Sequence, residues 1–341
     1  IQVIDSRGTP TVSCKIVLEN GLSATSMVPS GASTGSREAL ELRDGSDSFM
    51  GKGVTKAITN IQEIIAPALI GVDVTNQQEI DEKMIALDGT SSKSKLGANA
   101  ILGVSLAVLN LAAKSLGLPL YRYVNKVFND INGVNLVMQM PVPMLNIING
   151  GEHADNNLDI QEFMIMPIGA NNFYQAMQWS TEIYSNLKQL LQTKGLSTSV
   201  GDEGGFAPNL SSNDEAIELI ITAIRNNKLV EGTDVGIALD CAASEFYDDG
   251  IYNLKGEQKE LNSTEFSQYL SELTNQYPII SIEDGMDEND FQGWSNLNQV
   301  LGNKCQLVGD DLFVTNISEL QRGIDECLAN SILIKFNQIG T

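Results

Sequence analysis

The sequence predicts an α/β fold, namely a (β/α) barrel of the TIM type, incomplete at its C-terminal end and preceded by an α+β domain. Two observations favour this fold class. Four short apolar runs in the second half of the chain each end on an ionisable residue, and strand-like and helix-like segments alternate from about Val137 onward. Apolar runs of this length are typical of strands buried on both faces of a parallel sheet. Alternating strands and helices are the pattern of such a sheet or barrel.

The first part of the chain has the order expected of an α+β domain. Residues 1–28 predict two strands, because residues 11–18 alternate between apolar and polar side chains and Asn20-Gly21 supplies a hairpin turn. A Gly/Ser loop and several helical segments follow, the last of them an apolar helix over 98–116. We place this domain at residues 1–133, because the polar, Asn-rich stretch at 125–135 is the best candidate for a boundary.

The second part, residues 134–341, alternates as a barrel does. The predicted strands are 142–148, 160–167, 236–240, 279–283, 306–310 and 332–335, and the predicted helices are 173–192, 213–225, 264–275 and 318–328. A complete eightfold barrel usually takes roughly 250 residues. We therefore expect a barrel that lacks its C-terminal part.

Composition and charge limit the classes of partner. The chain of 341 residues has 42% hydrophobic side chains and a mean hydropathy near zero, which is typical of a globular protein with two domains. Its net charge of −22 argues against nucleic acid and anionic membranes, since both need a basic surface. A protein with this negative charge would also repel an anionic substrate. Binding such a substrate would therefore require local cations.

The cysteines and the single histidine restrict the chemistry further. None of the four cysteines forms a C-x-x-C pair, which favours a reducing, cytoplasmic compartment. Because His153 is the sole histidine, a zinc or iron site with several histidines is excluded, and a metal would be held by oxygen. Residues 1–10 lack a secretory signal, and polar residues interrupt the apolar stretch 98–118, so we expect a buried helix and no membrane span.

Four charged residues stand at the ends of the predicted barrel strands: Asp240, Glu283, Asp310 and Lys335. The last two intervals, of 27 and 25 residues, suit one strand plus one helix, and barrel active sites lie where the strands end. One acid at a strand end is as often a capping group as a ligand. Three converging carboxylates, however, repel one another unless a divalent cation lies among them. A lysine beside that cation would lose its proton more easily, as a general base must.

Three further segments could carry chemistry. Residues 201–206 place Glu203 among three glycines, and His153 lies in a similar Gly-rich loop. Dense glycines let the backbone approach a ligand closely, although tight surface turns with solvated side chains are the commoner case. Glu162 interrupts an apolar strand, which is harder to explain by exposure alone. The loop at 30–35 could bind phosphate through its backbone, but it has no nucleotide-binding motif.

Several blocks, in order along essentially the whole chain, resemble the enolase family. They are Asp5-Ser6-Arg7-Gly8-Thr9-Pro10-Thr11, Ser30-Gly31-Ala32-Ser33-Thr34-Gly35, Lys95-Leu96-Gly97-Ala98-Asn99, Gln161-Glu162-Phe163-Met164-Ile165, Gly201-Asp202-Glu203-Gly204-Gly205-Phe206, Gly309-Asp310-Asp311 and Lys335-Phe336-Asn337-Gln338. Residues 151–157 and Asp284-Gly285 are closer to bacterial-type members. The resemblance implies the barrel fold, a small anionic substrate and a homodimer or higher homo-oligomer.

The resemblance also implies roles for individual residues. Asp240, Glu283 and Asp310 would hold one Mg²⁺, and Ser33 would help to hold a second. Lys335 would remove the proton next to the substrate carboxylate. Glu203, with Glu162, would protonate the departing hydroxyl, and His153 would close over the substrate. The implied substrate-binding residues are His153, Gln161, Glu162, Ser33, Glu283, Asp310 and Lys335.

The implied reaction is the Mg²⁺-dependent, reversible dehydration of 2-phosphoglycerate to phosphoenolpyruvate through an ene-diolate, a hydro-lyase step of glycolysis and gluconeogenesis. A divalent cation and a Lys or His base are the known combination for enolase-type proton abstraction. One alternative is a related Mg²⁺ enzyme acting on another carboxylate. A second is a non-catalytic binding protein on the same scaffold, with moonlighting partners at the cell surface. Enolases continue beyond Lys335 with further phosphate and carboxylate contacts, so a molecule ending at Thr341 should not turn over substrate.

Overall fold

The computed structural model describes residues 1–31, 35–201 and 203–341, and its contacts divide the chain into two compact units. Unit 1 comprises Ile1–Gln139, Val314–Asn316 and Ile334–Thr341, and unit 2 comprises Met140–Phe313 and Ile317–Leu333. The boundary suggested by composition, at residue 133, lies a few residues before Gln139. The assignment of the last residues to unit 1 has no counterpart in the sequence analysis, because long-range contacts leave no local pattern in a sequence.

Unit 1 contains a three-stranded antiparallel sheet in the order β1-β2-β3. The strands are β1 (Gln2–Ile4), β2 (Pro10–Val17) and β3 (Ser23–Met27). The predicted hairpin joins β2 to β3: Gly21 takes a positive φ of 85°, and the Leu22 N–H donates to Oδ1 of Asn20 (3.0 Å). The sequence predicted two strands here, and the short β1 is a third, pairing along the opposite edge of β2.

Helices make up the rest of unit 1. They are α1 (Thr55–Asn60), α2 (Ala66–Leu69), α3 (Gln77–Asp88), α4 (Ala98–Ser115), α5 (Leu120–Asn132) and α11 (Phe336–Ile339), with a 3₁₀ turn at Ser48–Gly51 and a π turn at Ile61–Ile65. By length and composition alone α4 could cross a membrane, but 72% of it is buried inside the fold. Its burial is that of a core helix, as the sequence predicts.

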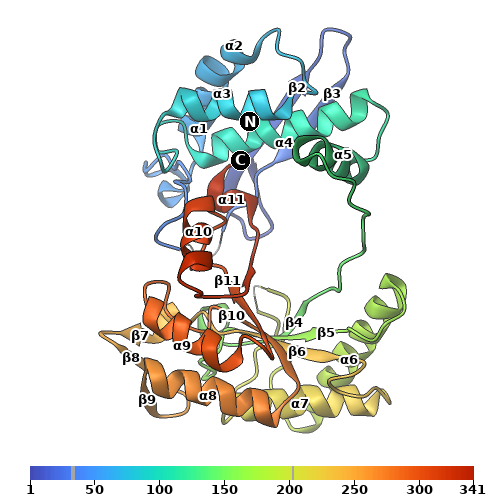
Figure 1. Cartoon of the computed structure of the whole chain (residues 1–341), viewed down its shortest axis with the longest axis vertical. Coiled ribbons are helices and arrows are strands. Elements are labelled where there is room, and N and C mark those ends of the chain that lie inside the picture. Colours follow the sequence, from blue (N-terminus) through green and yellow to red (C-terminus); the bar gives the residue numbers. More distant parts are fainter. Residues whose placement is uncertain (32–34, 202) are drawn as a thin grey trace. The chain divides into compact units, whose positions relative to one another are not determined.

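Unit 2 is built on a six-stranded sheet in the order β12-β11-β10-β6-β5-β4 (Figure 1). The strands are β4 (Leu145–Asn149), β5 (Glu162–Met166), β6 (Gly236–Asp240), β10 (Ile279–Glu283), β11 (Gln306–Gly309) and β12 (Ser331–Ile332). From β6 to β12 neighbouring strands are parallel, whereas β4, β5 and β6 pair antiparallel. The predicted α/β class with a parallel sheet is confirmed. Among the described residues this sheet is open and not a closed barrel.

Helices and a small hairpin sheet complete unit 2. The helices are α6 (Phe173–Thr193), α7 (Asn213–Asn226), α8 (Ser263–Gln276), α9 (Phe291–Leu301) and α10 (Ile317–Asp325), with 3₁₀ turns at Gly151–His153 and Ala243–Phe246. The second sheet consists of β7 (Tyr247–Asp248), β8 (Ile251–Leu254) and β9 (Lys259–Asn262). It was missed because its strands are short and lack clear alternation.

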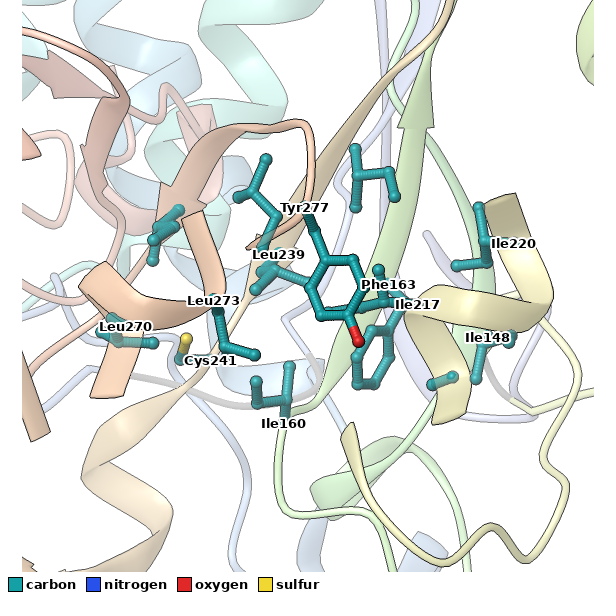
Figure 2. Close-up of a cluster of buried hydrophobic side chains, with 14 of the residues drawn as sticks. Ile148, Ile160, Phe163, Ile217, Ile220, Leu239, Cys241, Leu270, Leu273 and Tyr277 are labelled. Carbon is teal, nitrogen blue, oxygen red and sulfur yellow. The ribbon is translucent and has the colours of Figure 1, made fainter. Parts of the chain in front are cut away.

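The core of unit 2 lies between the large sheet and its helices. Figure 2 shows Phe163 and Leu239 of the sheet among side chains of α7 and α8, including Ile217 and Leu273. Phe163, Leu239 and Ile217 are fully buried. Burying each such side chain stabilises the fold by about 1.5–3 kcal/mol. This packing holds the strands, and therefore their ends, in fixed positions.

One predicted strand is shorter than expected. Residues 332–335 were assigned to a strand, but β12 ends at Ile332, and the Leu333 N–H makes one more bond to the Gly309 carbonyl (3.1 Å). The neighbouring strand β11 itself ends at Gly309, so it offers no further partners. The Lys335 N–H instead donates to the Thr315 hydroxyl (2.9 Å), and Lys335 is the residue before α11.

Candidate active site

Three acidic residues lie in register across neighbouring strands of unit 2. Glu162 on β5 and Glu283 on β10 are both paired with Asp240 on β6, which lies between them. Paired residues on adjacent strands project from the same face of a sheet. Asp240 and Glu283 are only 7% and 8% exposed. The strand ends therefore bring together a row of carboxylates, which includes Asp240 and Glu283, two of the four charged residues predicted at strand ends.

Asp240 is held by its neighbours on both oxygens. The Gln161 amide donates to Oδ2 and the Ala242 N–H donates to Oδ1, each at 3.0 Å. Burial and the nearby charge of Glu162 raise the pKa of Asp240 to about 7, although these two hydrogen bonds act in the opposite direction. The charge of Asp310 raises it further, which places Asp310 within electrostatic reach of this row.

A second acidic group lies one residue beyond the strands. One oxygen from each of Asp284, Asp310 and Asp311 lies within 4.8 Å of the others. The Asp284 carboxylate accepts the N–H groups of Asp310 and Asp311, both at 2.9 Å. Burial raises the pKa of Asp284 well above its usual range. We interpret Asp284 as the group that orients the loop carrying Asp310. The sequence analysis missed this role, although an acid directly after Glu283 was a visible signal.

His153 lies beside the same row of carboxylates. It ends the 3₁₀ turn Gly151–His153, and its Nδ1 is 3.2 Å from Oε1 of Glu162. The contact with Glu162 raises the pKa of His153 above 6.5, against the opposing effect of burial. The charge of Glu203 acts in the same direction, so the structure brings His153, Glu162 and Glu203 into one neighbourhood.

Two glycines near Glu203 allow neighbouring segments of the backbone to pack closely. A Cβ at Gly201 would lie 2.7 Å from the His153 carbonyl oxygen, and one at Gly205 would lie 2.8 Å from the Ile147 carbonyl carbon. The buried Asn149 amide donates to the Gly205 carbonyl at 2.6 Å. The sequence suggested that these glycines let the backbone approach a ligand. In the structure, Gly201 lets the chain approach the backbone of His153, and Gly205 lets it approach strand β4.

Two predicted residues are not placed in this group. Lys335 belongs to unit 1, where its backbone N–H donates to the Thr315 hydroxyl. Its position beside the carboxylates of unit 2 therefore stays a prediction. Ser33 lies outside the described residues. The Gly35 N–H, two residues later, donates to Glu38 (3.1 Å).

The residues present fit a hard divalent cation. Asp240, Glu283 and Asp310 supply carboxylate oxygens, the ligand type that Mg²⁺ prefers. The charges of Glu162 and Asp310 raise the pKa of the buried Asp240, and a divalent cation among these carboxylates would offset the cost of ionising them together. Gln161 would contribute indirectly, because its amide orients Asp240.

Parallel strands that alternate with helices and carry carboxylates at their ends are typical of metal-dependent enzymes of the (β/α) class. Comparison with family models identifies the family. The model described as the enolase N-terminal domain matches residues 1–124, and the model described as the enolase C-terminal TIM barrel domain matches residues 137–341. The chain therefore belongs to the enolase family. An enolase-type, metal-dependent lyase function with a small anionic substrate follows from that membership.

Proposed function

We propose that this protein is the glycolytic enolase, phosphopyruvate hydratase, which interconverts 2-phosphoglycerate with phosphoenolpyruvate and water. The observation that carries the proposal is the in-register row of Glu162, Asp240 and Glu283 beside His153. Such a row suits a substrate whose carboxylate must bind through a cation in an acidic protein. The net charge of −22 gives the same reason for a metal-mediated contact.

The proposed metal ligands are Asp240, Glu283 and Asp310 for one Mg²⁺, with Ser33 contributing to a second. When bound, the two ions would neutralise the negative charge that builds up on the substrate carboxylate as the neighbouring carbon loses its proton. Gln161 would hold Asp240 in its ligating orientation. This ligand set accounts for the burial of carboxylates at the ends of otherwise apolar strands.

The proposed proton transfers are divided between two side chains. Lys335 would take the proton next to the carboxylate, and Glu203, assisted by Glu162, would give a proton to the departing hydroxyl. His153 would bind the substrate from its loop, where Glu162 keeps it in place at 3.2 Å. Glu162 and Glu203 both act on the pKa of His153, which supports a common site for these three groups.

An absorbance assay for phosphoenolpyruvate tests the reaction. We expect product from 2-phosphoglycerate in the presence of Mg²⁺, its loss on addition of EDTA, and recovery with excess Mg²⁺. With the full-length protein, an absence of Mg²⁺-dependent product would overturn the proposal, and turnover of another carboxylate alone would support the related-enzyme alternative.

Hydrogen exchange separates the base from the acid. Lys335→Ala should abolish exchange of the proton next to the carboxylate and lower turnover by about 10²–10⁴-fold. Glu203→Gln should lower turnover to a similar extent and leave that exchange measurable. Mass spectrometry of substrate recovered from deuterated water gives both rates. Loss of exchange in Glu203→Gln would show that the acid is assigned incorrectly.

We further propose a cytoplasmic homodimer or larger homo-oligomer, with surface display as a secondary location. The four free cysteines, three of them buried, support a reducing compartment. Cell fractionation tests the location, and sedimentation of the purified protein tests the assembly. A purely secreted protein or a monomer at micromolar concentration would contradict the respective proposal.

A further inference from the structure

Two adjacent asparagines connect the loop of His153 to the loop of Glu203. We call residues 150–160 the histidine loop and residues 203–211 the glutamate loop. The Asn156 amide donates to the carbonyl of Asn149 (2.9 Å) and to that of Pro208 (3.1 Å). The Asn157 amide donates to the Leu210 carbonyl, and its oxygen accepts the Leu210 N–H (3.0 Å). Each asparagine thus bonds to the backbone of the glutamate loop.

Only an amide side chain suits these contacts. Asn157 donates to and accepts from the same residue, which requires an NH₂ group and a carbonyl on one side chain. Asn156 donates to two carbonyls and also accepts the Leu158 N–H at 3.2 Å. The bonds to Pro208 and Leu210 join segments about fifty residues apart in sequence, so they are tertiary contacts and not local turn interactions.

The histidine loop has a second attachment on the side of the small hairpin sheet. Oδ1 of Asp159 accepts the N–H of Gly256, which lies in the turn between β8 and β9 (3.0 Å). A Cβ at Gly256 would lie 1.9 Å from the Asn157 carbonyl oxygen, so the two segments are in close contact. The loop that carries His153 is therefore bonded to the glutamate loop and to this hairpin.

We infer that Asn156 and Asn157 are positioning residues that hold His153 and Glu203 in a fixed relation to each other. The inference rests on the proposed function in one respect, namely that these two side chains act on the same substrate. Neither asparagine is assigned any contact with substrate or metal. Their effect on the reaction would come entirely from the alignment of the two loops.

Alignment matters because proton transfer depends steeply on distance. A displacement of about 1 Å in a reacting group can lower the rate by about 100-fold. The step affected would be protonation of the departing hydroxyl by Glu203, and not removal of the first proton by Lys335. Loss of the asparagine contacts should therefore separate turnover from hydrogen exchange.

The first experiment compares Asn157→Ala with a matched control, Asn330→Ala. Asn330 has the same chemistry in the same unit: its oxygen accepts the Leu307 N–H (2.7 Å) near the start of β11, and its amide donates to the Gly302 carbonyl (3.0 Å). We expect kcat of Asn157→Ala to fall by about 100-fold with KM changed less than about threefold and exchange retained. Asn330→Ala should shift the unfolding midpoint comparably and leave the ratio of turnover to exchange unchanged.

The second experiment uses no substrate. Because His153 is the sole histidine, its ring protons can be followed in an NMR titration without ambiguity. Loosening the loop should weaken the bond to Glu162, so the titration midpoint in Asn157→Ala should move down towards 6.5. Asn156→Ala should do the same, and it takes the place of Asn157→Ala if that variant fails to fold. Asn330→Ala should keep the wild-type midpoint.

The outcomes are distinguishable. A lowered midpoint together with a lowered ratio of turnover to exchange supports the inference. An unchanged midpoint in both asparagine variants, or turnover and exchange that fall together as in a general loss of structure, overturns it. If the wild-type protein does not turn over 2-phosphoglycerate, the proposed function fails, and the NMR titration alone decides whether the asparagines position His153.

Discussion

The middle and the ends of the strands in unit 2 differ sharply within one residue. Leu239 is fully buried against the helices, and Asp240, the next residue on β6, is a carboxylate that is 7% exposed. Ile282 and Glu283 on β10 repeat the contrast. Leu239 packs against side chains of α7 and α8 (Figure 2). Because successive side chains along a strand point to opposite faces, the acid that follows it faces the other side of the sheet.

The contrast separates what stabilises the fold from what the site requires. Burial of Leu239 is favourable by about 1.5–3 kcal/mol. Asp240 has the opposite effect in the metal-free protein, because a carboxyl with a raised pKa is harder to ionise in the folded state than in the unfolded state. The apolar middle of the sheet therefore compensates for the charges that its ends bring together.

The largest effect should follow from changing Asp240 to Asn. Loss of a metal ligand should reduce Mg²⁺-dependent turnover by at least about 10³-fold. The metal-free variant should nevertheless melt at a higher temperature than the metal-free wild type, because one of several close negative charges is removed. Oε1 of Gln161, which has no hydrogen-bond partner among the described residues, can accept from the new amide after a flip. Thermal unfolding in EDTA and in Mg²⁺ measures both effects, and a lower melting temperature in EDTA would contradict the explanation.

The next effect concerns the middle of the same strand. Leu239→Ala should lower the free energy of unfolding by about 2–5 kcal/mol, since it leaves a cavity in the core. Turnover well below the melting temperature should remain within about threefold of the wild type, because the side chain faces away from the site. Urea unfolding and the phosphoenolpyruvate assay provide the two numbers. A selective loss of Mg²⁺ dependence would show that the two faces are not independent.

Ser281 is a polar exception in the middle of β10. Its side chain is fully buried, and within the described part of the chain its hydroxyl has no hydrogen-bond partner. Ser281→Ala should therefore leave the free energy of unfolding unchanged or raise it by up to about 1–2 kcal/mol. Urea unfolding tests this, with Ser267→Ala as a control that removes a buried hydroxyl bonded to the Ser263 carbonyl. A marked destabilisation by Ser281→Ala alone would indicate a hydrogen bond to this hydroxyl.

The smallest expected effect is a change in how the free energy of unfolding depends on pH, through His153 beside the strand ends. The pKa of His153 is raised in the folded protein, so its charged form stabilises the fold below pH 6.5. This contribution should be lost as the pH rises from 6.5 through the raised pKa. In the His153→Gln variant, the free energy of unfolding should therefore fall less over this pH range than in the wild type. Urea unfolding of metal-free protein at several pH values tests this, and parallel curves for the two proteins would contradict the role of Glu162.

The candidate site was partly predictable because some of its signals are local. An apolar run that ends in an acid identified Asp240 and Glu283, and the order of residues identified α4 as a buried helix. The sequence shows that an acid, Asp284, follows Glu283, but its partners could not be predicted, since they are backbone N–H groups of residues 310 and 311. The end of β12 at Ile332 was also not predictable from local sequence, because the length of a strand depends on the backbone groups of the neighbouring strand that can pair with it.

Residue order alone was enough to predict the class of fold, to restrict a candidate metal site to oxygen ligands and to show the enolase resemblance, because periodicity, composition and short motifs are properties of neighbouring residues. The register of Glu162, Asp240 and Glu283, the asparagine contacts between two loops and the assignment of Lys335 to unit 1 came from folding. They depend on segments far apart in the chain, whose mutual position is set by the packing of a shared core and by backbone hydrogen bonds that no local pattern records.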